Sequence, residues 1–190
     1  MPLPQEYRYT YADALTWDES ERIELICGDP VMMAPPSREH QKISGEIYLQ
    51  IATYLKGKKC EVYHAPFGVR LFEKEGASPY DVDTLVEPDI TVVCDPGKLD
   101  DAGCKGAPDL IVEILSPSTQ RHDRLTKYNL YQRAGVREYW IVDPDARVVS
   151  VYTLEEGAYH AAAAYSSRAS VPVGVLEGCG IDLTAVFTEP

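Results

Sequence analysis

The most constraining feature of this chain is a carboxylate inside an apolar run. Residues 109–115 have the sequence D-L-I-V-E-I-L, so Glu113 stands among Leu, Ile and Val side chains. A continuous run of this kind is typical of a strand that is covered on both faces of its sheet. Burying a carboxylate is costly unless a cation or hydrogen-bond donors meet it. Glu113 therefore needs a positive partner, and the candidates are a metal ion, Lys127 or both.

The length and composition of the chain predict one domain that spans residues 1–190. A chain of 190 residues with 45% hydrophobic and 25% charged residues can bury a full core. No apolar run reaches the roughly 18 residues that a membrane-spanning helix needs. The first six residues also lack the basic and apolar regions of a signal peptide. We expect a cytoplasmic protein that does not contact a membrane.

The five cysteines are scattered and include no C-x-x-C pair. This spacing argues against both a zinc cluster and a disulfide framework. Most of them have apolar neighbours, so we interpret them as small buried hydrophobic residues. They are Cys27, Cys60, Cys94, Cys104 and Cys179.

The net charge of −12 argues against a general nucleic-acid binder, which would carry a basic patch. The charge is unevenly distributed, however. Residues 121–138 contain five basic residues against two acidic ones, whereas residues 73–89 contain six acidic residues against one lysine. An acidic pocket beside a basic helix suits a metal-assisted reaction on a phosphate ester. A solvated acidic surface is the more common explanation of such a charge run.

Hydrophobic periodicity, caps and turn residues predict an α/β fold with a mixed sheet. The first two strands should form a hairpin and the last three a meander. Segments 74–84 and 95–108 are expected to be connections. We predict helices over residues 10–17, 37–57 and 119–134, and strands over residues 22–27, 31–34, 61–65, 68–73, 88–94, 109–115, 138–143, 147–153 and 158–163.

The predicted strand and helix bring Lys127 to the depth of Glu113. Glu113 lies three residues before Ser116, where the strand ends, or roughly 10 Å of strand. Lys127 lies eight residues beyond Thr119, where the helix starts, or roughly 12 Å of helix. A short turn sends the helix back over the sheet, so the two side chains should lie level with each other.

Asp89 enters the sheet on a separate strand and could complete a metal site with Glu113. A carboxylate pair suits Mg²⁺, or Mn²⁺, because such hard cations take oxygen ligands and keep several waters. Lys127 would then position or deprotonate an attacking water, while the metal lowers the pKa of that water.

These pieces together resemble the Uma-two family, a bacterial group of unknown function in the PD-(D/E)xK, restriction-endonuclease-like superfamily. The resemblance extends from about Tyr9 to Phe187. It implies a restriction-endonuclease-like mixed sheet flanked by helices, with Asp89 as the first metal-binding acid and Glu113 as the acid of the E-x-K motif. The matching segments are E-L-I-C-G-D at 24–29, S-R-E-H at 37–40, E-P-D-I at 87–90, V-E-I-L-S-P-S-T at 112–119, D-x-x-x-K-x-x-x-Y at 123–131 and E-Y-W-I-V-D-P at 138–144.

The chain departs from the superfamily pattern two residues after Glu113, where Leu115 occupies the position of the lysine. The resemblance to the narrower family implies that the lysine has moved to the helix, as Lys127. It also makes Glu24, the hairpin glutamate, an additional acid at the site.

Each of these residues also has a purely structural explanation. Glu113 could form an ion pair with Lys127 and no metal, and Asp89 could simply begin a strand. Lys127 could instead pair with Asp123 on the helix surface. Glu24 could pair with Arg22, which shares its strand face.

Four further residues are candidates for substrate contact. His40 is either a surface histidine at the start of a helix or a phosphate contact. Tyr131 lies one turn beyond Lys127 and could touch substrate or pack against the sheet. Arg121 and Arg124 could hold a phosphate backbone or remain solvated.

The sequence favours a metal-dependent endonuclease that hydrolyses DNA phosphodiester bonds, acting as a homodimer. One alternative is a regulatory or binding module without activity, with the meander as its dimer interface. Another is a hydrolase of small phosphate esters. The charge of −12 favours both alternatives, since it weakens affinity for DNA.

Overall fold

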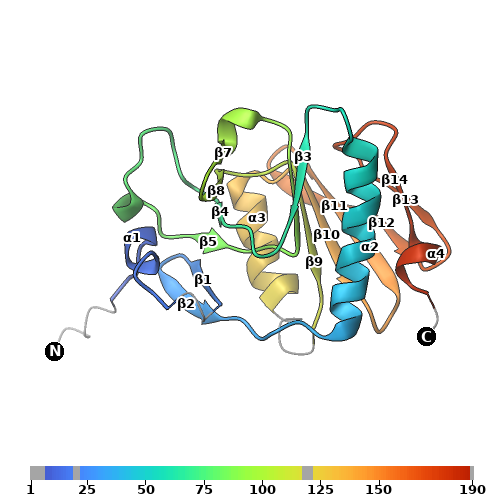
Figure 1. Cartoon of the computed structure of the whole chain (residues 1–190), viewed down its shortest axis with the longest axis horizontal. Coiled ribbons are helices and arrows are strands. Elements are labelled where there is room, and N and C mark those ends of the chain that lie inside the picture. The colour runs from blue at the N-terminus through green and yellow to red at the C-terminus, as the bar shows by residue number, and fades with distance from the viewer. Residues whose placement is uncertain (1–6, 19–21, 117–121, 189–190) are drawn as a thin grey trace.

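A six-stranded mixed sheet lies at the centre of the protein in the computed structural model, which describes residues 7–18, 22–116 and 122–188 (Figure 1). Its strand order is β12-β11-β10-β9-β6-β3, and only β9 and β10 run parallel as neighbours. The predicted mixed sheet and the meander β10–β12 are confirmed. The strands are β3 (Glu61–His64), β6 (Ile90–Val93), β9 (Leu110–Ile114), β10 (Glu138–Asp143), β11 (Val148–Glu155) and β12 (Ala158–Ser166).

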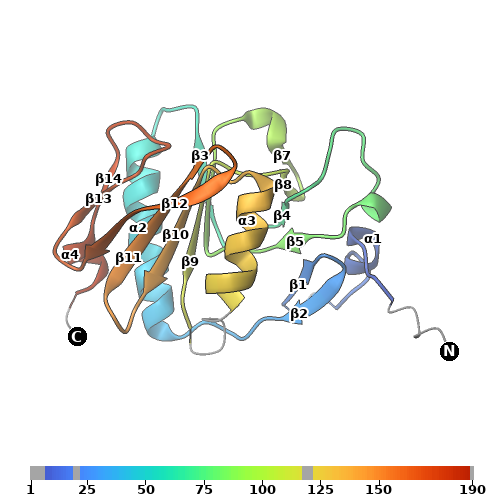
Figure 2. The same cartoon turned by 180° about the vertical axis from the view of Figure 1, so that it is seen from behind.

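Two helices cover the two faces of this sheet (Figures 1 and 2). On one face, α2 (Arg38–Leu55) begins where the Ser37 hydroxyl accepts a hydrogen bond from the His40 N–H. The apolar stripe of α2, which includes Ile43 and Ile47, is buried against β6 and β9. On the other face, α3 (Tyr128–Ala134) packs through Leu130 and Tyr131. No helix in the described parts of the chain has both the length and the apolar character needed to span a bilayer.

A second sheet of short strands lies beside α3, with the order β2-β1-β5-β4-β8-β7 (Figure 2). The predicted N-terminal hairpin is β1–β2, where Gly28 turns the chain at φ 83°. This sheet shares an apolar cluster with α3 and the far face of the central sheet. Its strands are β1 (Ile23–Ile26), β2 (Asp29–Met32), β4 (Val69–Arg70), β5 (Leu85–Val86), β7 (Leu99–Asp100) and β8 (Gly103–Lys105).

Several short elements differ from the sequence prediction. The segment predicted as a plain connection at 95–108 contains the β7–β8 hairpin, because Gly103 at φ 123° permits a turn that a side chain would obstruct. The C-terminal elements were not predicted, since they are too short to show periodicity. They are β13 (Ser170–Pro172), β14 (Gly180–Asp182) and α4 (Leu183–Val186). The remaining helix, α1 (Tyr11–Ala14), is shorter than predicted.

The interpretation of most cysteines as unbonded, buried hydrophobic residues does not hold for two of them. Cys60 and Cys94 form a disulfide, while Cys27, Cys104 and Cys179 are free thiols. Cys60 immediately precedes β3 and Cys94 immediately follows β6, and these strands pair antiparallel with Glu61 opposite Val93. The pairing register therefore places the two cysteines side by side.

Candidate active site

Lys127 lies between two buried glutamates. Its Nζ is 2.9 Å from Oε1 of Glu24 and 2.9 Å from Oε1 of Glu113. Less than 5% of each of the three residues is exposed: 2% for Glu24, 4% for Glu113 and 3% for Lys127. The structure therefore brings Glu113 and Lys127 to the same depth, as the strand and helix lengths predicted.

Three separate elements position these groups. Glu113 is in β9, which is buried along its whole length. Lys127 ends a π-helical turn, His122–Lys127, that leads into α3. Such turns are uncommon and are often found at functional sites. Glu24 is in β1, where its Oε1 also accepts a hydrogen bond of 2.9 Å from the backbone N–H of Glu87.

Tyr131 lies one helical turn beyond Lys127 and donates a hydrogen bond of 2.6 Å to Oε1 of Glu113. Burial and the neighbouring Glu113 carboxylate raise the pKa of Tyr131 well above its ordinary value. The phenol therefore stays protonated and acts as a donor. Tyr131 also packs against the sheet, as one of the two sequence interpretations predicted.

Among the residues that the structure describes, this cluster contains two carboxylates and one ammonium. Glu24 and Glu113 share the ammonium of Lys127. The alternative pairing of Glu24 with Arg22 is wrong, because Arg22 bonds Glu87 at 3.0 Å instead. Burying these carboxylates is costly, and the ammonium of Lys127 offsets part of that cost.

Asp89 lies level with Glu113 at the end of the central sheet. It immediately precedes β6, whose Ile90 pairs with Val112 of β9, so continuing the register sets Asp89 opposite Glu113. Its Oδ2 accepts a hydrogen bond of 2.7 Å from the backbone N–H of Ile114. Asp89 therefore links the ends of β6 and β9, in addition to beginning a strand.

His40 approaches Asp89 from the first turn of α2. Its Nε2 lies 3.1 Å from Oδ2 of Asp89, and only 12% of its side chain is exposed. The interpretation of His40 as a surface histidine is therefore wrong. An imidazole that bonds a carboxylate fixes the orientation of that carboxylate.

Asp89 and Glu113 supply carboxylate oxygens, the ligand type that hard divalent cations prefer. Within residues 7–18, 22–116 and 122–188, no three His, Cys, Asp or Glu side chains are grouped so that they could hold a metal together. Mg²⁺ needs fewer protein ligands, because it keeps several of its waters. In the described chain, Oδ1 of Asp89 makes no hydrogen bond, which leaves it available as a ligand.

Comparison with known proteins identifies the family. Residues 8–184 match the Uma2 family, whose description is "Putative restriction endonuclease". The chain belongs to this family. It is the Uma-two family that the sequence motifs resemble.

Two relatives of this Uma2 protein cover most of its length. An uncharacterized protein of Synechocystis, slr1290, is 27% identical over 152 residues, which is 78% of this chain and 72% of the relative. A crystal structure described as a putative nuclease belonging to DUF820, from Anabaena variabilis, has a TM-score of 0.73 at 20% identity. That match covers 95% of this chain and 98% of the other. The Uma2 protein therefore has a nuclease-like fold.

Of the two predicted phosphate contacts, Arg124 is among the described residues and Arg121 is not. Arg124 is 41% exposed in its side chain and bonds Asp143 at 2.8 Å, where β10 ends. Arg121 is outside the described residues, as is the side chain of Asp123, the alternative partner of Lys127.

Sequence reasoning missed the backbone N–H groups of Glu87 and Ile114, because a backbone donor leaves no mark on the sequence. It also missed Thr91, which is fully buried in β6 with no partner for its hydroxyl in the described structure. Thr91 pairs with Ile111, two residues before Glu113, so it lies on the face of the sheet that carries Glu113.

Glu138, the acid of the E-Y-W-I-V-D-P motif, has a structural role away from the candidate site. Glu138, at the start of the E-Y-W-I-V-D-P segment, is 1% exposed. Its Oε1 accepts a hydrogen bond of 2.6 Å from the Trp140 indole, and its Oε2 accepts one of 2.8 Å from the Val175 N–H. Glu138 therefore anchors the C-terminal segment to β10 in this Uma2 protein.

Proposed function

We propose that this protein is a divalent-metal-dependent endonuclease that hydrolyses phosphodiester bonds of DNA. The observation that carries the proposal is the buried Glu24–Lys127–Glu113 cluster, which has two carboxylates for one ammonium. The Asp89 carboxylate adds a further negative charge at the same end of the sheet. Carboxylate oxygens are the ligand type that Mg²⁺ and Mn²⁺ prefer.

Asp89 and Glu113 would hold the metal, Mg²⁺ or Mn²⁺. When bound, such an ion supplies Lewis acidity and offsets the charge that develops on the phosphoryl oxygens. The chain itself fixes the two acids: His40 and the Ile114 N–H hold Asp89, and Tyr131 holds Glu113. Their orientation is therefore set before a substrate arrives.

Lys127 would orient the attacking water, since an ammonium donates hydrogen bonds but has no lone pair to accept the proton of that water. Its ammonium is held by Glu24 and Glu113 on two different strands, so little reorganisation is needed during the reaction. The oxygen of the water would bond to phosphorus as the ester P–O bond breaks, the proton of that water would pass to solvent, and the leaving oxygen would take a proton from solvent. Arg124, with Arg121, would hold neighbouring phosphates of the strand.

The proposed enzyme acts as a homodimer in the cytoplasm, where bacterial DNA is found. The meander supports an interface between two copies, because β12 is the last strand of the central sheet and leaves one edge unpaired among the described strands.

Cleavage of supercoiled plasmid DNA with Mg²⁺ or Mn²⁺ tests the proposal. We expect nicked or linear product, which disappears with EDTA and falls at least about 100-fold in Glu113→Gln. The matched control is Glu155→Gln, an exposed glutamate at the end of β11, which should retain full activity. Lack of cleavage with either metal, or equal cleavage by Glu113→Gln, would contradict the proposal.

A parallel assay separates the two alternatives. Hydrolysis of a small phosphate ester such as p-nitrophenyl phosphate, without DNA cleavage, would favour the small-molecule hydrolase. Absence of both activities together with absence of manganese binding would favour the binding module.

A further inference from the structure

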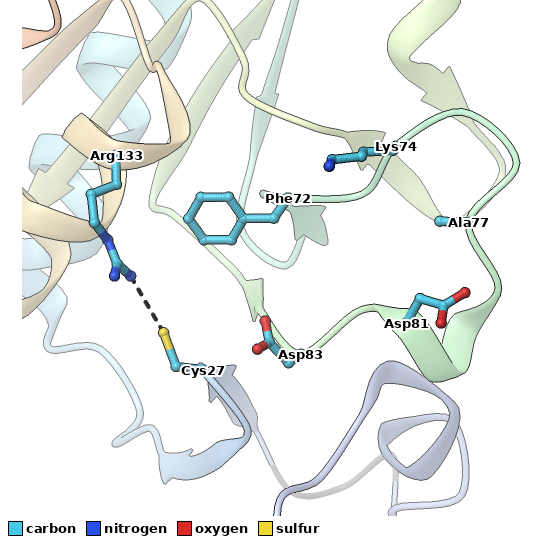
Figure 3. A pocket seen from close by; sticks show the side chains of 7 residues that line it. All are labelled: Cys27, Phe72, Lys74, Ala77, Asp81, Asp83 and Arg133. Carbon is cyan, nitrogen blue, oxygen red and sulfur yellow. Dashed lines mark hydrogen bonds between the residues drawn. The ribbon is translucent and has the colours of Figure 1, made fainter.

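A pocket of about 590 Å³ lies between the end of β1, α3 and the segment 72–83 (Figure 3). It is built on two of the elements that carry the candidate active site. Cys27 lies immediately after β1, three residues beyond Glu24, and Arg133 lies six residues beyond Lys127 in α3. The pocket therefore lies on the continuation of the same two elements as the candidate site.

An aromatic ring forms one wall of the pocket. Phe72 is 38% exposed, so part of its ring is accessible from the solvent. The guanidinium of Arg133 lies 5.8 Å from the centre of this ring and donates a hydrogen bond of 3.4 Å to Sγ of Cys27. Figure 3 shows the ring between Arg133 and Lys74. Nucleobases stack on such rings, and an arginine beside the ring adds to the attraction.

Two carboxylates that line the pocket each have one oxygen in a hydrogen bond and a second oxygen without one among the described residues. Oδ2 of Asp81 accepts a hydrogen bond of 3.0 Å from the Ser78 N–H, and Oδ1 of Asp83 accepts one of 2.8 Å from the Thr84 hydroxyl. The second oxygen of each carboxylate makes no hydrogen bond to any described residue. Ionised carboxylates only accept hydrogen bonds, so they select amino groups and reject carbonyl oxygens.

A cation completes the set of lining groups. The ammonium of Lys74 makes no hydrogen bond or ion pair within the described chain, although it lines the pocket. A lysine ammonium of this kind binds phosphate as a point charge. The pocket thus combines an aromatic ring, acceptors for amino groups and a cation for phosphate.

We propose that this pocket binds one nucleotide whose base carries an amino group, namely cytosine, adenine or guanine. The base stacks on Phe72, its amino group donates to Asp81 or Asp83, and its phosphate lies near Lys74. The inference rests on the proposed nuclease function only in assigning this nucleotide to the strand that is cleaved.

Cys27 supplies a reporter for the test. It is the free thiol that is not buried, since Cys104 and Cys179 are buried and Cys60 is bonded to Cys94. Burial raises the pKa of Cys104 to about 11 and also raises that of Cys179, which slows their reaction at neutral pH. Iodoacetamide should therefore modify Cys27 in the folded protein, and Cys27→Ser should remove this modification.

Protection of Cys27 by cytidine and uridine monophosphates tests the proposal without divalent metal. The two ligands differ at position 4 of the base, which is an amino group in cytidine and a carbonyl group in uridine, and at N3, which carries a hydrogen only in uridine, where it lies between two carbonyl oxygens that a carboxylate repels. We expect cytidine monophosphate to slow the modification saturably, and uridine monophosphate to bind at least about five-fold more weakly. Equal protection by both nucleotides, or none by either, would overturn the proposal.

Variants assign the effect to the pocket and separate it from catalysis. Phe72→Ala should weaken protection by both nucleotides, and Asp81→Asn with Asp83→Asn should remove the preference for cytidine. The control Asp101→Asn changes an exposed aspartate outside the pocket, so it should leave the protection and the preference for cytidine unchanged. Protection without DNA cleavage would overturn the nuclease function alone, whereas cleavage without protection would overturn this pocket assignment alone.

Discussion

The ammonium of Lys127 lies 2.9 Å from a carboxylate oxygen of Glu24, although 103 residues separate them in the chain. The contact joins the N-terminal hairpin to the helix that packs on the central sheet. It also brings a second acid to Lys127, which already bonds Glu113. This relationship turns a simple buried ion pair into an acidic cluster, and it is the physical basis of the proposed metal site.

Replacing Lys127 should destabilise the protein much more than replacing Glu113. Lys127→Met leaves two buried carboxylates without their ammonium, so we expect a loss of about 3–5 kcal/mol in the free energy of unfolding. Glu113→Gln keeps a carbonyl oxygen for Lys127 and Tyr131 and removes one surplus charge, so its loss should be much smaller. Urea denaturation of both variants measures the difference. Equal losses would show that the cluster carries no surplus negative charge.

Two glycine substitutions should change stability in opposite directions. A Cβ on Gly174 would lie 2.9 Å from Oε2 of the buried Glu138, so Gly174→Ala should cost about 1–3 kcal/mol. A Cβ on Gly45, within α2, would have no neighbouring atom of the described chain within 4 Å, so Gly45→Ala should gain about 1 kcal/mol. Thermal unfolding of the two variants provides the comparison. A neutral Gly174→Ala would mean that the Glu138 anchor tolerates displacement.

Stability should fall at alkaline pH because the fold raises the pKa values of several tyrosines, of which Tyr131 and Tyr159 are buried and Tyr63 is half-buried. Burial raises the pKa of Tyr63 to about 12, and it also raises the pKa values of Tyr131 and Tyr159. Folding therefore favours their neutral forms, and this contribution is complete below about pH 10 and is lost as the pH rises towards the folded-state values. Denaturation as a function of pH should show this decline.

Tyr131→Phe provides the control for the alkaline decline. Removing one raised pKa should make the decline shallower by about 1.4 kcal/mol per pH unit above pH 10. An unchanged slope in this variant would indicate that Tyr131 ionises as readily in the folded protein as in the unfolded chain.

The contact between Glu113 and Lys127 could be predicted because both positions depend on regular rises along one strand and one helix. The partner of Glu24 could not be predicted from spacing. Arg22 is as suitable a partner as Lys127 in the sequence, and only the packing of the β1–β2 hairpin against α3 decides between them. The burial of His40 beside Asp89 likewise depends on where α2 starts relative to β6. The pocket at Phe72 joins three distant segments, and no local pattern indicates that they meet.

The disulfide between Cys60 and Cys94 depends on which two predicted strands pair with each other. Cys60 precedes the predicted strand at 61–65 and Cys94 is the last residue of the predicted strand at 88–94, and antiparallel pairing of those strands is enough to bring them together. Sequence spacing alone gives no reason to choose that pairing, since strand order is set by the whole sheet.

Titration of Mn²⁺ into the purified protein, followed by calorimetry, tests the proposed metal site most directly. We expect one site per chain, lost in both Asp89→Asn and Glu113→Gln and retained in the exposed control Asp101→Asn. Circular dichroism of each variant would confirm that it is folded. Binding that persists in both active-site variants, or a folded wild-type protein that binds no Mn²⁺, would contradict the assignment of Asp89 and Glu113 as a shared metal site.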